Sequence, residues 1–462
     1  ARGMRADVDR TASALVGWVL AVLVPLAAVL AALAHPLAGL VSREAEGRAL
    51  VAGLLAVFAV QVPLYGLAVV LSGVLQAQKK FFWPAFAPVM SSLVVIGSYL
   101  AFAAVADGAQ TDPAQLSAAA FGWLAWGTTA GVAALSLPLL VPVRRSGVRL
   151  RPTLRFPAGT GRRVRSLAAA GLGGLLAQQL AVLAALVLAT RFGERSTYSV
   201  WVAAQQVYLL PYAVLAVPLA TSAFPRLAER AGTLDRAGFA RLHARSSRVV
   251  VAVSLLGVAV LVAVSEAVAG VFVAIGIGEA SRIAAMGPAL AFSAPGVLGL
   301  GLLFHHTRAL FALERGRLAV AATAAAWTGV VLASLVACLV LVGDDPDGPR
   351  TLVALGLGTS VGMTIGAGAV LAATRRAAGP EALTGVARSL GVGVLAAGVG
   401  AFLGRATTST TAQVLGESGW TWIVAGGGGA LLAAAVVLGG LWLADRGTLA
   451  GVGQRDERTA HD

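Results

Sequence analysis

Twelve apolar runs, each about as long as a bilayer is thick, constrain this chain more than any other feature. An α-helix needs about 20 apolar residues to cross the hydrocarbon core. The runs lie at 12–34, 50–76, 84–106, 117–141, 165–190, 197–224, 247–272, 284–306, 318–342, 351–373, 384–404 and 419–444. The sequence therefore predicts an all-α polytopic membrane protein with about twelve transmembrane helices.

Composition excludes several other classes of protein. The chain is 58% hydrophobic and only 12% charged, whereas a soluble domain carries about a quarter charged residues. Its single cysteine, Cys338, allows no intrachain disulfide and no zinc site built from cysteines. No HExxH, GxxxxGK[ST] or GxSxG pattern occurs. We therefore expect no enzyme activity, no cofactor and no metal site.

The basic residues give the topology. Of the 35 Lys and Arg residues, 28 fall in alternate segments between the predicted helices and 7 in the others. Basic segments stay in the cytoplasm, so both termini of this chain are predicted to be cytoplasmic. The segments 143–165 and 225–248 are the most basic, with eight and six Arg. They either attract anionic lipid headgroups or form linkers that move during a transport cycle. They lack the interleaved aromatic residues of a nucleic-acid site, so no nucleic-acid partner is expected.

An internal repeat divides the chain. The predicted helices that begin at 12, 50, 84 and 117 have counterparts at 247, 284, 318 and 351, at a nearly constant offset of about 235. We expect these two four-helix blocks to superpose. The helices at 165–190 and 197–224 have no counterpart in the first block. This asymmetry suggests two further helices upstream, and without them one wall of the cavity should be open and this chain alone should not transport.

One predicted helix is unlike a plain membrane anchor. The stretch Tyr208–Arg230 contains Pro211 and Pro218, and proline removes a backbone donor and bends a helix. Lipid tolerates such a bend only where a neighbouring helix or a cavity satisfies the freed carbonyls. Gln205 and Gln206 lie about one turn earlier. We expect this helix to be a hinged, moving wall of a polar cavity, with one of the two glutamines facing inward.

Other polar residues within the spans are candidates for the same pathway. Gln178 and Gln179 lie mid-span, and Gln61 lies two residues before Pro63. Each side chain either lines the pathway or holds two helices together through a hydrogen bond. Glu266, near the outer end of its span, is either an ion or proton site or is exposed at the outer interface.

Two further sets of residues receive structural interpretations. The cytoplasmic end of the span 284–306 carries His305, His306 and Arg308, which are therefore expected at the cytoplasmic interface. The two histidines are adjacent and lack the i, i+4 spacing of a helical metal pair. Gly358, Gly362 and Gly366 recur every four residues, which indicates close packing against a neighbouring helix. The same interpretation applies to Gly426–Gly429.

Two motifs of the chain are characteristic: GVLQAQKKFFWPAFAPVMSSLVVI (Gly73–Ile96) and VYLLPYAVLAVPLATSAFPRLAER (Val207–Arg230), with a weaker one at Gly301–Thr323. In these motifs the chain resembles the MurJ/MviN family of lipid II flippases, within the multidrug, oligosaccharidyl-lipid and polysaccharide exporter superfamily. The resemblance implies two six-helix lobes around a central cavity and an extra C-terminal helix pair, with the family's first two helices absent here. Where many members carry an arginine before the Leu-Pro, this chain has Gln206.

The resemblance also implies domains, partners and location. The implied parts are a four-helix remainder of the N-terminal lobe (1–142), a basic linker (143–165), a six-helix lobe (166–376), the helix pair (377–446) and a cytoplasmic tail (447–462). The implied substrate is an undecaprenyl-linked peptidoglycan precursor moved by alternating access across the bacterial cytoplasmic membrane, where this family contributes to cell-wall biogenesis and cell shape. Alternatives are another lipid-linked polysaccharide, a drug, or a non-transporting scaffold for cell-wall synthesis proteins.

Overall fold

The computed structural model describes residues 2–41, 45–78, 80, 82–108, 115–151, 153–156, 160–194, 196–276, 280–416 and 418–444, with side chains throughout except at 2–8, 40–41, 160–172 and 282. Within these ranges the chain is helical and contains no strand. Eleven helices are long and apolar enough to cross a membrane, or twelve if a pair broken at residues 294–295 forms one span. The prediction of about twelve transmembrane helices is confirmed, and the tail 447–462 lies outside the described residues.

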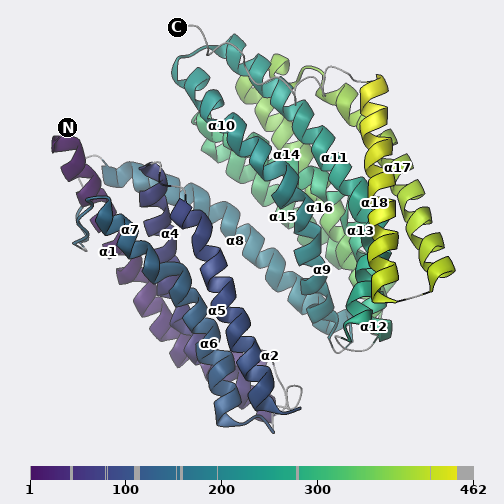
Figure 1. Cartoon of the computed structure of the whole chain (residues 1–462). Coiled ribbons are helices and arrows are strands. Elements are labelled where there is room, and N and C mark those ends of the chain that lie inside the picture. The colour runs from purple at the N-terminus through teal and green to yellow at the C-terminus, as the bar shows by residue number, and fades with distance from the viewer. Residues whose placement is uncertain are drawn as a thin grey trace. The chain divides into compact units, whose positions relative to one another are not determined.

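The chain forms two compact units, 1–166 and 167–462. In Figure 1 the first unit runs from purple to blue and the second from teal to yellow. The helices of the first unit are α1 (Arg2–Ala32), α2 (Ala34–Val41), α3 (Ala45–Ala59), α4 (Gln61–Ala77), α5 (Phe82–Ala106), α6 (Ala118–Ser136), the 3₁₀ turn η2 (Leu137–Leu139) and α7 (Leu140–Arg145). Their core lies at the end of the unit that contains α7, around Leu71, Leu75, Leu139 and Val143.

The start of the basic linker is fixed to α1. The Ser13 hydroxyl accepts a hydrogen bond from the Arg151 backbone N–H (3.0 Å), and the Trp18 indole donates to the Leu154 carbonyl (2.9 Å). Gly17 lies in direct contact with the Thr153 backbone, where a Cβ atom could not fit. This part of the 143–165 segment is therefore extended along a helix of unit 1.

Among the described residues, unit 2 contains most of α8, ten further α-helices, one π-helical turn and one 3₁₀ turn. In order they are α8 (Thr160–Phe192), α9 (Thr197–Pro211), the π-helical η3 (Tyr212–Ala216), α10 (Val217–Gly232), α11 (Arg236–Ala274), α12 (Ala280–Ala284), α13 (Met286–Ser293), α14 (Gly296–Ala312), α15 (Gly316–Leu341), α16 (Gly348–Ala378), the 3₁₀ turn η4 (Pro380–Leu383), α17 (Val386–Leu415) and α18 (Gly419–Ala444). The long helices α11 and α16 are its most buried spans.

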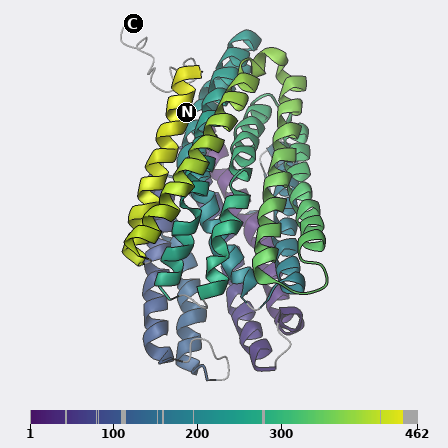
Figure 2. The same cartoon turned by 90° about the vertical axis from the view of Figure 1, so that its right-hand side faces the viewer.

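The last two helices form an antiparallel pair against α11. In both Figure 1 and Figure 2, α17 and α18 run side by side at one edge of unit 2. Trp422 of α18 packs directly on Gly270 of α11, and Leu255 of α11 fills the space beside Gly393 of α17. Their buried residues share one apolar cluster with α11, which includes Leu255, Val437 and Leu441.

The predicted glycine stripe is confirmed on α16. Gly358 contacts Ser334, Gly362 contacts the Val330 backbone and Gly366 contacts Ala326, all on α15, at distances that leave no space for a side chain. On α18 the expectation holds for two of four glycines. Gly426 and Gly429 lie against neighbouring helices, whereas Gly427 and Gly428 face open space.

Candidate substrate pathway

The span with the two prolines changes its helix type between them. Pro211 ends α9, residues Tyr212–Ala216 form a π-helical turn, and α10 begins at Val217 with Pro218 as its second residue. A π-turn adds one residue to a helical turn and is frequently found at functional sites. Here the missing backbone donors of two prolines, seven residues apart, give it a direct cause. The hinge assigned to Pro211 and Pro218 stays a prediction.

Glycines on the neighbouring helices make room for this irregular segment. A Cβ atom on Gly257 of α11 would lie 2.7 Å from Cβ of Pro211, and one on Gly301 of α14 would lie 3.4 Å from Cβ of Ala216. Tyr212 packs edge-on against Phe304 of α14 with ring centroids 5.4 Å apart. The π-turn is therefore held between α11 and α14, at positions where the neighbouring side chains are smallest.

A second interrupted span lies beside the first. Helices α13 and α14 bend by 45° at Ala294–Pro295. In an unbroken helix the Gly296 N–H would donate to the Phe292 carbonyl. Instead, the Ser360 hydroxyl of α16 accepts from the Gly296 N–H (3.1 Å) and donates to the Phe292 carbonyl (2.6 Å). A single side chain thus satisfies both backbone groups at the break, as the membrane interior requires.

The predicted glutamines have different surroundings. Gln61 donates through Nε2 to the Thr129 hydroxyl (2.9 Å), which joins α4 to α6 within unit 1. Gln178 and Gln179 of α8 and Gln206 of α9 are exposed, and Gln205 is half-buried. An amide facing hydrocarbon without a partner is costly, so exposed glutamines at membrane depth favour a water-filled space beside α8 and α9. Their role as pathway residues stays a prediction.

Glu266 has a partner that the sequence interpretation did not consider. Its carboxylate forms an ion pair with the Arg405 guanidinium of α17, which also lies within hydrogen-bond distance of the Ser265 hydroxyl (3.4 Å). Arg405 directly follows the span predicted at 384–404, and α17 continues past it to Leu415. A signal is present in the sequence, because Glu266 and Arg405 lie at the ends of two predicted spans that share the same outer side.

The two histidines predicted at the cytoplasmic interface are buried between helices, and their position relative to the membrane stays a prediction. His305 and His306 are 1% and 0% exposed, and they pack against His243 of α11, which is also 0% exposed. The sequence of α14 does not indicate which other helix packs against His305 and His306. The contact with His243 could therefore not be predicted from it. Arg308 is half-exposed and lies over the Phe304 ring, 4.0 Å from its centroid. Among the described residues, no group of His, Cys, Asp or Glu could hold a metal ion.

Two interrupted helices side by side, exposed amides and many membrane spans are the features of a transporter rather than of an anchor. The family described as lipid II flippase MurJ matches residues 5–420 of this chain. The chain belongs to the MurJ family. The resemblance inferred from Gly73–Ile96 and Val207–Arg230 is confirmed.

Solved structures agree with membership of the MurJ family. A lipid II flippase MurJ in an inward closed conformation is similar with a TM-score of 0.68 and 14% identity, covering 96% of this chain and 85% of that one. An inward-facing multidrug resistance MATE family transporter has a TM-score of 0.60 at 14% identity, covering 81% and 86%. The Vibrio cholerae MATE transporter VcmN in its bent form has a TM-score of 0.55 at 15% identity, covering 83% and 86%. At these identities the similarities concern the fold.

Proposed function

We propose that this chain moves lipid II, the lipid-linked peptidoglycan precursor, from the inner to the outer leaflet of the bacterial cytoplasmic membrane by alternating access. The observation that carries the proposal is membership of the MurJ family over residues 5–420. Physically, a sugar and pyrophosphate headgroup cannot cross hydrocarbon unsolvated, whereas a prenyl tail can remain in lipid. The protein must therefore supply a polar route for the headgroup alone.

Two features of unit 2 support this role. The exposed amides of Gln178, Gln179 and Gln206 can donate to and accept from sugar hydroxyls and phosphate oxygens. The π-turn Tyr212–Ala216 lies at the middle of the 36-residue span Thr197–Gly232, where its two halves can change angle. These amides are neutral, so they would position the headgroup without neutralising its charge.

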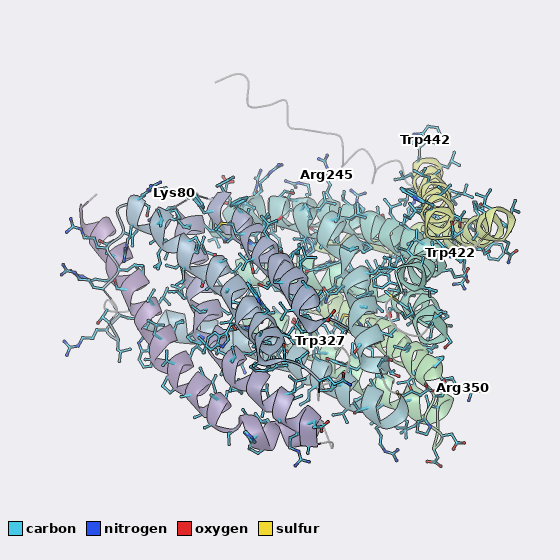
Figure 3. All side chains as sticks on the ribbon, turned by 60° about the horizontal axis from the view of Figure 1, so that its bottom comes forward. Lys80, Arg245, Trp327, Arg350, Trp422 and Trp442 are labelled. Carbon is cyan, nitrogen blue, oxygen red and sulfur yellow. The ribbon has the colours of Figure 1, made fainter. Side chains whose placement is uncertain are left out.

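The proposed orientation places both ends of this chain in the cytoplasm. Arg245 near the start of α11 and Arg350 near the start of α16 lie at opposite ends of unit 2 (Figure 3). The Arg245 end belongs to the strongly basic 225–248 segment, which favours the cytoplasm, and anionic lipids are the expected neighbours there. Cysteine labelling at introduced positions tests this, because a reagent that reaches position 346 only from the cytoplasm would contradict it.

The direct test of transport replaces the cell's own flippase. In a strain depleted of its MurJ protein, the complete protein should restore lipid II exposed on the outer leaflet, measured by cleavage with an enzyme added to spheroplasts. Gln206→Leu should reduce exposure severalfold at equal protein level, while Val202→Leu, an exposed apolar position one turn earlier on α9, should not. Normal cell-wall protein recruitment with no gain in exposed lipid II would instead support a scaffold.

The similarity to MATE transporters supports one alternative within the same fold. A drug or another lipid-linked saccharide would then be the transported molecule. Export of such a compound from loaded vesicles, together with unchanged lipid II exposure in the depleted strain, would favour this alternative over the lipid II proposal.

A further inference from the structure

Three imidazoles are buried together at one end of unit 2. His243 comes from the start of α11, and His305 and His306 from the end of α14. The ring centroids of His243 lie 5.1 Å from His305 and 4.6 Å from His306, and those of His305 and His306 are 5.4 Å apart. All three side chains are at most 1% exposed. Arg245, two residues after His243, marks this end of the unit in Figure 3.

Each ring has one nitrogen in a hydrogen bond whose direction is fixed. The Ala382 carbonyl can only accept, so His243 Nδ1 donates to it (3.0 Å). The Thr374 hydroxyl donates to the Val370 carbonyl and therefore accepts from His306 Nδ1 (3.0 Å). By the same reasoning, the Ser246 hydroxyl donates to the backbone carbonyl of His243 and accepts from His305 Nε2 (3.0 Å). Each imidazole thus has its N–H directed outward from the cluster.

The second nitrogen of each ring has no partner. His243 Nε2, His305 Nδ1 and His306 Nε2 are buried and make no hydrogen bond. With their other nitrogens donating, all three carry a lone pair. A buried acceptor without a partner costs about 1–3 kcal/mol, and here three occur in one cluster. Three unpaired nitrogen lone pairs in one cluster can bind a cation. The geometry among the described residues does not fit a metal ion, which leaves a proton.

Aromatic and basic side chains lie around the cluster. Phe239 of α11 stacks on His243, with centroids 5.9 Å apart. Arg308 of α14 lies close enough to His305 for a Coulombic interaction, and Arg248 of α11 lies against Gly385. Tyr212 of η3 interacts with Arg308. The charged residues of α16 and η4 nearby, Arg375, Arg376 and Glu381, are exposed. No carboxylate of the described residues pairs with any of the rings.

We propose that His243, His305 and His306 form a proton-binding site, and that binding one proton releases the 379–385 link from the cluster. This link joins α16 to α17 through η4. Its Ala382 is 0% exposed and accepts the His243 hydrogen bond. Gly379 and Gly385 at its two ends have φ of 86° and 80°, so the backbone turns sharply at both ends. The link is the short cover over the cluster, whereas the other walls are long helices.

The sign of the effect follows from solvation. With the link in place, the rings are buried and His305 lies near Arg308, an environment that disfavours a further positive charge. With the link displaced, water reaches the rings, and an imidazole in water titrates at about pH 6.5. The open state therefore binds more protons. Lowering the pH favours the open state, by at most about tenfold per pH unit for one proton.

Hydrogen exchange of the complete protein in lipid nanodiscs tests this site directly. Exchange of the 379–385 backbone is compared at about one pH unit above and below 6.5, with labelling times scaled to equalise the chemical exchange rate. The test variant is His243→Asn/His305→Gln/His306→Asn, which keeps an amide donor near each outward hydrogen bond but cannot titrate. The matched control is His35→Asn, because His35 is exposed on α2 in unit 1. If the triple variant does not fold, single His306→Asn replaces it, and because two rings can still bind a proton its pH dependence should be smaller than in the wild type rather than absent.

In the wild type and in His35→Asn, protection of the link should fall severalfold at the lower pH. In the triple variant it should stay constant. Protection that does not depend on pH in the wild type would overturn the proposal. So would an equal loss of protection in the cluster variants. A change in protection at constant pH on adding Zn²⁺ or a chelator would show a metal site and would also overturn it. No lipid substrate is present, so these outcomes are independent of whether lipid II is transported.

Discussion

Replacing Ser360 with alanine should destabilise the broken span more than its size suggests. The hydroxyl accepts from the Gly296 N–H (3.1 Å) and donates to the Phe292 carbonyl (2.6 Å), and Ser360 is only 8% exposed. Ser360→Ala leaves both backbone groups without this partner in a buried place.

The magnitude can be bracketed from the two hydrogen bonds. Side-chain hydrogen bonds between transmembrane helices average about 0.6 kcal/mol, which gives a lower value of roughly 1.2 kcal/mol for two. Each buried polar group left without a partner costs about 1–3 kcal/mol, and two such groups set the upper limit of the expected loss in the free energy of unfolding. We expect a loss of about 2 kcal/mol in the free energy of unfolding.

The control is Ser293→Ala, the same substitution at the last residue of α13, directly before the break. The Ser293 hydroxyl donates only to the Ala289 carbonyl of its own helix, one turn earlier (2.7 Å), and is also buried. Its removal should cost well under 1 kcal/mol, because that carbonyl is already part of a helix. The free energy of unfolding is measured by titration with denaturing detergent. Equal losses for Ser360→Ala and Ser293→Ala would refute the assignment of Ser360 as the group that satisfies the break.

Three further changes have expected outcomes. Gly362→Ala on α16 should destabilise the protein by about 1–3 kcal/mol, because its new Cβ meets the Val330 backbone. Gly368 faces open space, so Gly368→Ala should be neutral or stabilise the protein by up to about 1 kcal/mol. Equal effects of the two substitutions on the free energy of unfolding would contradict the packing of Gly362. Glu266 and Arg405 should show a coupling of about 1 kcal/mol in a double-mutant cycle, and a coupling near zero would mean that the ion pair contributes nothing. The hydrogen bond from the Gly238 N–H, and secondly that from Arg230, lower the pKa of Asp235. The Asp235 carboxylate therefore stabilises α11 at pH values above its unfolded pKa of about 3.9. This stabilisation is lost as the pH falls through the lower pKa of the folded state. Asp235→Ala should thus be less stable than the wild type at pH 7, and a difference that persists in strong acid would contradict the assignment.

Hydropathy predicted the membrane spans well because each span must bury about the same length of apolar chain. It failed where a helix continues past the apolar run. The span predicted at 247–272 is the middle of α11, which starts at Arg236 behind an Asp235 N-cap. The span predicted to end at 404 continues to Leu415. These extensions are polar on part of their surface, so hydropathy alone cannot distinguish them from loops.

The candidate site was predictable only where a local cause exists. Proline has the same backbone chemistry in any fold, so the irregularity after Pro211 and the break at Pro295 could be expected from sequence. The groups that compensate for these breaks could not. Ser360 lies 64 residues from Gly296, and His243 lies 62 residues before His305. Nothing in the local pattern distinguishes Ser360 from the other hydroxyls of α16, because its role depends on how α16 packs against the bend.

The two interrupted spans are in contact with each other, and this arrangement connects the fold to the proposed transport. Tyr212 of the π-turn packs on Phe304 of α14, and the Tyr208 hydroxyl would lie 2.8 Å from a Cβ on Gly296, directly after the break. On the other side, both spans rest on α11 and α16, which are continuous and the most buried of the spans. A change of angle at the π-turn would therefore act on the bend at Pro295 through direct contact. In alternating access, a few irregular positions absorb the motion while long helices keep their shape, so the proposed transport predicts that the π-turn and the bend at Pro295 change angle together.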